Sequence, residues 1–517
     1  MRIPGLDLAF VRVPAPLPIW RACVDADAWQ IAARAVAAAK GRLVALWGVD
    51  RGGSLAVCAA YALADGLAWL DLTLAADTPS YPDVSGLFPC AVRMQRAAAD
   101  LLGIVAVGAR DTRRWLDHGA WPSDRFPLHE HAPESSAAVE RSAVVDYPFV
   151  RVAGDGVHEI PVGPVHAGII EPGHFRFSVV GEKVLRLEER LGYTHKGIEK
   201  RFTELALLDA HRLAGRVAGD STVAYAWAFC MALESATGAD VPPRAQWLRA
   251  LLLERERVAN HLGDLGALAN DAALTFGLAQ FSRLREDWLR LSKEVFGHRW
   301  LMDCIAPGGT AVDVDDAGAA RIDAQCEATM REATALRAIY DEHAGLQDRF
   351  VGAGTVSPEL AAELGLVGLA GRASGRALDL RVDHPWPPYD RLAPKPATQR
   401  SGDVAARVAV RFAELFESLR LLRAMLRALP PGEHRDAVHP GSGVAFGAGW
   451  VEGWRGEVMV ALELDDGPHG RRIRRCHCHD PSWQNWPVLE HAIIGNIVPD
   501  FPLINKSFNL SYSGHDL

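Results

Sequence analysis

The sequence is poor in cysteine and contains no Cys-x-x-Cys pair. Single cysteines without a paired framework are typical of a reducing compartment, whereas small secreted domains depend on disulfides. We therefore expect no disulfide scaffold and a protein that works in the cytoplasm. The eight cysteines among the 517 residues are Cys23, Cys58, Cys90, Cys230, Cys304, Cys326, Cys476 and Cys478.

Positive charge and long apolar runs are also lacking. The formal net charge is −9 at pH 7, which argues against nucleic-acid binding and against a basic membrane-surface patch. The N-terminus has no apolar run after a basic stretch, so we expect no secretory signal. The apolar stretch from Leu55 to Leu70 is interrupted by Asp65 and Gly66 and falls short of a membrane-spanning helix. The chain is expected to be soluble and to reach a membrane only through partner subunits.

The chain is long enough for two domains, with a third possible. Residues 1–128 alternate strand-like runs with helical runs, for example the helical spacing of Trp29, Ala32, Ala33 and Val36, and predict a small α+β domain. Residues 129–143 are small and polar and predict a linker. Residues 144–517 form the large domain.

The large domain reads as strands, then helices, then strands. Its pattern predicts an α+β fold in which a central helix bundle lies beside a β-sheet, and we expect the two ends of the domain to pair in one sheet. The helical stretches are predicted at 196–235, 243–275, 279–297, 315–347, 358–365 and 401–428.

Several stretches resemble one family in order and spacing. "GPVHAGIIEPGHFRF", "ERERVANHLGDLGALAND" and "RASGRALDLRVDHPWPPYD" resemble the large subunit of membrane-bound [NiFe] hydrogenases and, equally, the D-type subunit of NADH-quinone oxidoreductase (complex I). "MQRAAADLLGI" in the first domain is similar to the C-type subunit of complex I, although Gln95, Arg96 and Ala97 stand where that protein has Glu-Arg-Glu. Such a C/D-like fusion is typical of the group 4, energy-converting hydrogenase lineage.

The hydrogenase lineage holds nickel and iron on two Cys-x-x-Cys pairs, and the matching positions here carry no cysteine. The run "RVAGDS" puts Ala218 and Ser221 at the first pair, and "NLSYSG" puts Ser511 and Gly514 at the second. Neither methyl, hydroxyl nor glycine replaces a soft thiolate ligand. The resemblance therefore implies that no nickel–iron centre forms. It also implies that the C-terminal extension removed from hydrogenases is absent, since the sequence stops at Leu517.

The D-type subunit of complex I also lacks these cysteines and binds the quinone headgroup in the emptied cavity. By this resemblance His174 and Glu171 are candidates to line the cavity, while Tyr225 lies about one helical turn beyond Ser221. A lone histidine is as often structural. If the tail fills the old metal site, Tyr512 must be buried there beside hydrogen-bonded Asn509 and Ser511.

Charged residues near the predicted cavity need partners. An ionised Asp220 would require a buried counter-ion, and the candidates are Arg216, Arg372 and Arg381. The run Arg381, Asp383 and His384 is by default a solvated face, but the family resemblance makes a cavity wall or proton path equally plausible. The "CHCH" run at 476–479 predicts no metal site, because on a strand the cysteines and the histidines face opposite sides.

The resemblance implies a subunit of a membrane-associated, hydrogenase-related or complex I-like oxidoreductase. It would sit on the cytoplasmic face of the inner membrane, bound to ion-translocating membrane subunits and to a small subunit that carries the iron–sulfur cluster. The chain itself would hold no cofactor, apart from quinone or another small redox ligand in the vestigial cavity. The alternative is a scaffold or coupling subunit without redox chemistry. An independent soluble enzyme is a third, more distant interpretation.

Overall fold

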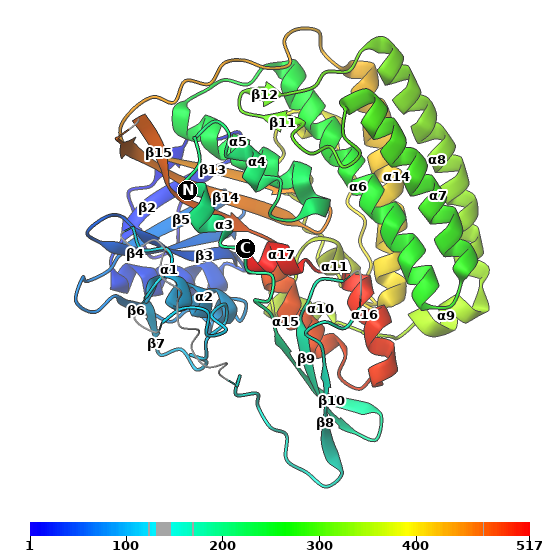
Figure 1. Cartoon of the computed structure of the whole chain (residues 1–517), viewed down its shortest axis with the longest axis horizontal. Helices are drawn as coiled ribbons and strands as arrows, with labels where there is room; N and C mark the ends of the chain where they lie inside the picture. Colours follow the sequence, from blue (N-terminus) through cyan, green and yellow to red (C-terminus); the bar gives the residue numbers. More distant parts are fainter. Residues whose placement is uncertain (123–124, 131–145, 168–169, 469) are drawn as a thin grey trace.

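The computed structural model describes residues 1–122, 125–130, 146–167, 170–468 and 470–517. Figure 1 shows the N-terminal domain on one side of the molecule and a bundle of long helices on the other, with a sheet between them. This arrangement confirms the expected α+β class with a small first domain and a large second one. Most of the predicted linker, residues 131–143, lies outside the described residues, but its first two residues are packed: His129 Nε2 is 3.1 Å from the Leu102 carbonyl, and Glu130 pairs with Arg472.

The N-terminal domain is built on a five-stranded sheet in the order β1-β2-β5-β4-β3, with β6 and β7 paired separately. Helix α1 buries the predicted face of Trp29, Ala32, Ala33 and Val36. The elements are β1 (Val11–Val13), β2 (Ile19–Val24), α1 (Ala26–Ala38), β3 (Arg42–Asp50), β4 (Leu55–Leu63), β5 (Gly66–Thr73), β6 (Ser80–Pro82), α2 (Ala91–Leu102) and β7 (Val105–Val107).

The large domain contains two separate three-stranded sheets, so the prediction that its two ends pair in one sheet is wrong. The first is β8 (Val157–Val162), β9 (His174–Val180) and β10 (Lys183–Arg190), and the second is β13 (Ala445–Glu452), β14 (Glu457–Gly467) and β15 (Gly470–His479). The ends of the domain meet outside these sheets, through an isolated bridge between Lys183 and Ile497 and through hydrogen bonds such as that from the Lys196 amide to the Leu517 carbonyl at 2.9 Å. The second sheet is instead covered by α5 (Thr222–Thr237). Gly447 and Gly449 permit this close packing, because a Cβ on either would lie 1.9 Å from an α5 carbonyl oxygen.

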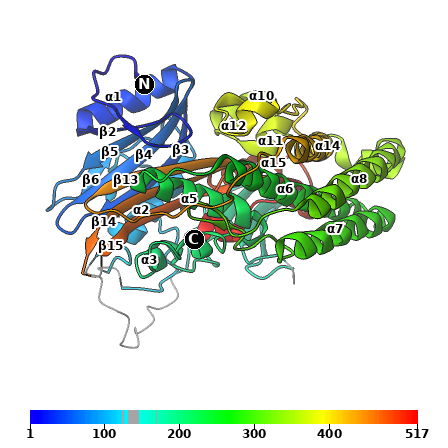
Figure 2. The same ribbon diagram turned by 90° about the horizontal axis from the view of Figure 1, so that it is seen from above.

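The long helices α6 (Pro243–Asp271), α7 (Thr275–Phe296), α8 (Asp316–Glu342) and α14 (Val404–Ala428) form the bundle. Figure 2 shows them extending away from the N-terminal domain. Within the described residues no helix is long and apolar enough to cross a membrane. The shorter elements are α3 (Ile198–Phe202), α4 (His211–Ala214), η1 (Gly219–Ser221), β11 (Ile305–Ala306), β12 (Gly309–Thr310), α9 (Ala344–Phe350), α10 (Pro358–Glu363), α11 (Gly368–Ala373), α12 (Leu380–Asp383), α13 (Tyr389–Leu392), α15 (Ser482–Ala492), η2 (Val498–Asp500), α16 (Phe501–Phe508) and α17 (Tyr512–Asp516).

The predicted helix over 196–235 is divided. Only α5 is long, and the residues before it form the short helices α3, α4 and η1. Gly197 lies in the left-handed region with φ 64°, a conformation that favours glycine, and it precedes α3 directly. The interruption matters because it places residues 218–221 in a tight turn at the start of α5.

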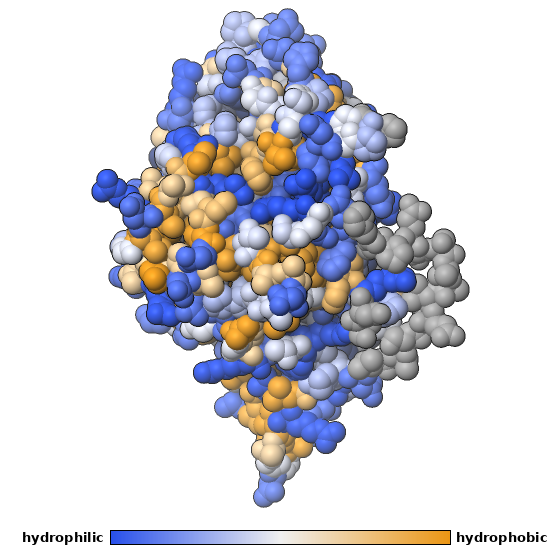
Figure 3. All heavy atoms as spheres, turned by 90° about the vertical axis from the view of Figure 1, so that its left-hand side faces the viewer, coloured by the Kyte–Doolittle hydropathy of each residue, from blue (hydrophilic) through white to orange (hydrophobic). Residues whose placement is uncertain are grey.

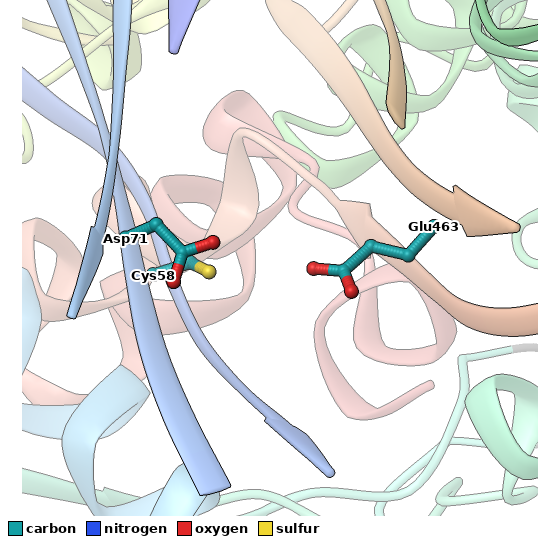
Figure 4. Close-up of side chains that lie close together, drawn as sticks. All are labelled: Cys58, Asp71 and Glu463. Carbon is teal, nitrogen blue, oxygen red and sulfur yellow. The ribbon is translucent and has the colours of Figure 1, made fainter. Parts of the chain in front are cut away.

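A buried ion-pair cluster joins the two domains. Arg51 bonds to both Asp71 oxygens, at 3.0 and 2.6 Å, and to both Glu463 oxygens, at 3.0 and 2.7 Å. Figure 4 shows Glu463 of β14 pointing across toward Asp71 and Cys58 on adjacent strands. The thiol and the two carboxylates lie within 4.8 Å of one another, a spacing that suits a metal ion. Because Arg51 bonds to both carboxylates and Arg21 also bonds to Asp71, at 2.5 Å, we interpret the cluster as an inter-domain ion-pair network.

The first prediction concerns this cluster. Replacing Arg51 by Met leaves the buried Glu463 carboxylate close to Asp71 without the cation that they share, and we expect a loss of about 3–5 kcal/mol in the free energy of unfolding. Arg34→Met, on the exposed face of α1, is the matched control and should change stability by about 0.5 kcal/mol or less. Denaturant unfolding followed by tryptophan fluorescence measures both. Equal effects of the two variants would contradict the assignment.

Candidate functional site: the vestigial metal position

The first vestigial segment, residues 218–221, is held by the helices around it. The Asp220 carbonyl accepts hydrogen bonds from Asn260 Nδ2 at 2.8 Å and from Trp454 Nε1 at 2.9 Å. Glu256 on α6 accepts from the backbone amides of Val223 at 2.6 Å and Ala224 at 3.2 Å. These amides are unsatisfied donors of the first turn of α5, so Glu256 fixes the start of that helix.

The second vestigial segment, residues 509–514, is buried near the end of the chain. Ser511 caps α17, since its Oγ accepts from the Gly514 amide at 2.8 Å, while its own amide donates to Ser482 Oγ at 2.9 Å. Trp486 Nε1 donates to the Ser511 carbonyl at 3.1 Å. Tyr512 is only 5% exposed and packs edge-on against Trp486. The tail is thus an integral part of the core rather than a frayed end.

Arg455 is the common contact of the two segments. Its guanidinium bonds to both Asp220 oxygens, at 2.7 and 2.5 Å, and to Ser221 Oγ at 3.3 Å. Its Nε donates to the Asn509 carbonyl at 2.6 Å. The expected partners of Asp220 are therefore wrong. Arg216 pairs with Asp303 at the surface, Arg372 with Glu414 and Glu452, and Arg381 with Asp379 and Glu254.

Asp480 occupies the space next to the second pair of ligand positions. It accepts a hydrogen bond from Tyr225 Oη at 2.6 Å, and both side chains are buried. A Cβ built on Gly514 would lie 2.3 Å from Asp480 Oδ2 and 2.8 Å from Ser511 Oγ. A cysteine at position 514 would therefore force its neighbours to move.

The residues at this position do not fit a nickel–iron centre. Ala218 and Gly514 offer no ligand atom, and Ser221 and Ser511 offer neutral hydroxyls whose hydrogen bonds are made within the protein. Nickel in such a site is bound by soft thiolates. A guanidinium cation also lies between the two segments, which repels a second cation. The arrangement is that of a salt-bridged core.

Asp220 and Glu256, which line the same small pocket, have opposite electrostatic behaviour. Burial would raise the pKa of Asp220, but the ion pair with Arg455 outweighs it and lowers the pKa. Burial raises the pKa of Glu256 to about 8, although the two amide donors oppose the shift. Asp220 is thus ionised at neutral pH, while Glu256 holds a proton near neutrality. Burial and the neighbouring Asp480 raise the pKa of Tyr225, which remains a neutral donor.

The structure separates the two residues expected to line the cavity together. Glu171 is exposed and accepts from the Ser513 amide at 3.1 Å, so it contacts the tail. His174 is 9% exposed and lies on the wall of another cavity, beside Arg176. His166, another histidine of the same motif, lies nearer the tail, with its ring 6.4 Å from that of Tyr512.

The run Arg381 to His384 belongs to a second buried polar network. Arg381 is 2% exposed and bonds to Glu254 of α6 at 3.0 Å. Asp383 is exposed and accepts from the Asp379 amide at 3.0 Å, and His384 packs against Trp450. The expected solvated face therefore holds for Asp383, whereas Arg381 is buried in the core.

The "CHCH" strand places its histidines in hydrogen bonds. His477 Nδ1 is 2.8 Å from Glu199 Oε1, and His479 Nε2 is 2.9 Å from Gln484 Oε1. Cys476 and Cys478 are buried on strand β15.

The residues that sequence analysis missed are Arg455 and Asp480. No spacing signal marks Arg455, whereas Glu256 and Asn260 were visible as an i, i+4 pair within "ERERVANHL".

The fold and the site define a class of protein: a two-domain subunit with the architecture of the large subunit of a redox complex. Side chains fill the position at which that architecture holds a metal. The family model "Respiratory-chain NADH dehydrogenase, 49 Kd subunit" matches residues 264–442, and "Respiratory-chain NADH dehydrogenase, 30 Kd subunit" matches residues 22–137. Formate hydrogenlyase subunit 5 of Escherichia coli K12 is 32% identical, over 87% of this chain and 79% of its own. The fused C/D protein of NADH-quinone oxidoreductase from Bacteroides thetaiotaomicron is 28% identical, over 75% and 76%.

A chain of the membrane-bound sulfane sulfur reductase, an archaeal respiratory membrane complex, superimposes with a TM-score of 0.65 at 26% identity, covering 70% of this chain and 99% of that one. The chain belongs to the family of fused 30-kDa/49-kDa-type subunits that hydrogenases of group 4 share with NADH-quinone oxidoreductase. Its homologues are subunits of hydrogenase and complex I-like assemblies.

The second prediction tests the Arg455 ion pair. Arg455→Leu leaves Asp220 without its cation. Removing one partner of a buried pair costs about 3–5 kcal/mol, but Asp220 is 36% exposed, so solvent screening reduces the expected loss to about 1–3 kcal/mol. Arg216→Leu, which breaks the exposed pair with Asp303, is the matched control and should cost less than about 1 kcal/mol.

The pH dependence of this loss has a fixed sign. The folded-state pKa of Asp220 is lowered, so the stabilisation is fully present above the unfolded value of about 3.9 and disappears as the pH falls through the lower folded-state pKa. Unfolding curves of the parent and Arg455→Leu should therefore differ most at pH 5–7 and converge on acidification. A difference that grows on acidification would rule out the pair as its cause.

Proposed function

We propose that this chain is a peripheral coupling subunit of a membrane-associated oxidoreductase complex, without a nickel–iron centre of its own. It connects a small subunit that carries an iron–sulfur cluster to ion-translocating membrane subunits, on the cytoplasmic face of the membrane. The single observation that supports this proposal is the Arg455 guanidinium bound between Asp220 and Asn509, where the lineage has a metal. The family relationship supports the assembly.

Quinone or another small redox ligand in the vestigial position is the second candidate. Tyr512 and Arg455 argue against it, because they are 5% and 7% exposed and occupy that region. A quinone headgroup would have to displace the tail or break the Asp220 pair. The purified complex, assayed for electron transfer to a soluble quinone, separates the candidates, since quinone reduction that Tyr512→Ala abolishes would favour the second.

The third prediction concerns nickel. The purified complex should contain no stoichiometric nickel and evolve no hydrogen, because none of the four ligand positions offers a thiolate. A variant with Ala218→Cys, Ser221→Cys, Ser511→Cys and Gly514→Cys should still bind no nickel, because Arg455 and Asp480 remain in place. Elemental analysis measures both proteins. About one nickel per chain in the parent complex would overturn the proposal.

The fourth prediction concerns partners. Val180 and Leu185 at the turn of β9 and β10 are 42% and 40% exposed, and Ile494 and Ile497 beside them are 45% and 37% exposed. Figure 3 shows apolar side chains along this projecting sheet. Exposed apolar groups of this kind mark the places where partner proteins bind, so the chain expressed alone should aggregate.

Affinity purification of the tagged chain from its native host tests this expectation. It should recover a ferredoxin-like or hydrogenase-small-subunit-like protein together with membrane proteins. Leu185→Asp should reduce that recovery, whereas Ile31→Asp, on exposed α1 of the other domain, should not. A monodisperse, active monomer would count against the complex.

A further inference from the structure

A cavity of about 710 Å³ lies between the two domains, away from Arg455. Its walls come from the loop 112–121, from the segment Asp146–Phe149, from the first sheet of the large domain at His174, Arg176 and Arg190, and from Tyr193, which follows β10. Small-molecule sites usually measure about 300–1,000 Å³. The volume is thus large enough for a ligand of one or two rings.

Arg190 supplies the cavity with a cation that lacks a carboxylate partner among the described contacts. It is 4% exposed and donates only to backbone carbonyls, those of Arg114 (2.6 Å), Trp115 and Asp117 (3.1 Å). Burial lowers the pKa of Arg190 to about 10. Burying a charge without a counter-ion is costly, so an anion in the cavity would be stabilised here.

The other cations on the wall are balanced, which singles out Arg190. Asp146, also on the wall, is exposed and is not bonded to Arg190 in the described contacts. The carboxylate partners are Asp111 and Glu188 for Arg113, Asp117 for Arg114, and Glu159 for Arg176.

Aromatic side chains pack against the arginines of this cavity. Arg190 and Arg113 lie 4.5 and 4.8 Å from the Tyr147 ring, and Arg176 lies 4.6 Å from the Phe149 ring. His118 meets Tyr193 edge-on, with ring centres 4.6 Å apart. Guanidinium groups over aromatic faces form the kind of surface on which a planar ring stacks while its charged substituent meets a guanidinium.

We propose that this cavity binds a planar organic anion, a flat ring that carries a carboxylate or a phosphate, with its charge near Arg190 and Arg176 and its ring against Phe149 and Tyr193. Its lining residues are different from those at the vestigial metal position. Its occupant is recognised by charge and shape, and the cavity adds a small-molecule site to a subunit whose old metal position is filled.

The test uses the purified complex and four probes: 1-naphthoate, 1-naphthyl phosphate, neutral 1-naphthol and inorganic phosphate. Calorimetry should find at least one ring-bearing anion binding at least 10-fold more tightly than 1-naphthol and than phosphate alone. The stronger of the two anions identifies the substituent. Failure of both to bind, or equal binding of 1-naphthol, would overturn the proposal.

Variants locate the binding. Arg190 holds a loop in place through hydrogen bonds to three carbonyls, so replacing it would also disturb that loop. Arg176→Gln is therefore the better test, and it should lower the affinity for the anion at least 10-fold. Arg186→Gln on the same hairpin is the matched control, because its side chain is 43% exposed and does not line the cavity. Tyr193→Leu should weaken the ring-bearing probes. Unchanged affinity in Arg176→Gln would place the ligand elsewhere.

Discussion

The bidentate ion pair between Arg455 and Asp220 is the constraint on which the centre of the large domain depends. In the hydrogenase lineage a metal cation draws two distant segments together through thiolates. In this chain one guanidinium reaches the same two segments, through a carboxylate on one side and the Asn509 carbonyl on the other. A cation is retained, but its ligands are hard oxygen atoms, and the geometry is that of a planar fork. The ion pair thus keeps the two segments together at the centre of the domain.

The same requirement for paired charge organises the helix bundle. Helix α6 is buried along most of its length, so its polar residues cannot reach water and must be matched across the interface with α14. These residues are spaced by seven and three positions along α6 and by three and four along α14, so they lie on one face of each helix. Arg372 and Arg381 form ion pairs within this network, so neither is available to pair with Asp220. The matched pairs are Glu254 with Ser418, His261 with Glu414, and Asp264 with Arg411.

Local pattern and family resemblance together predicted the class and the long helices, while the four vestigial positions stay a prediction from the resemblance. These predictions succeeded because helical periodicity and motif spacing depend on residues that are close together in the sequence. They failed where the answer is a long-range contact. Arg455 lies 235 residues from Asp220, and nothing in a sequence states that such residues meet. The expectation that the two ends of the domain pair in one sheet was wrong for the same reason, because strand pairing is itself a contact between residues far apart in the sequence.

One loop connects the filled metal position with the inter-domain cavity. Glu171 at its start holds the Ser513 amide of the tail, and His174 at its end faces the cavity. Between them Gly173 lies against Tyr512, where a Cβ would be 2.6 Å from the ring. Because a side chain at position 173 would push against Tyr512, this loop has little freedom to shift without moving the tail. Because Gly173 is the direct neighbour of His174, a ligand that repositioned His174 would act on Tyr512 through this glycine. The salt-bridged core around Arg455 is closely packed and would resist that movement.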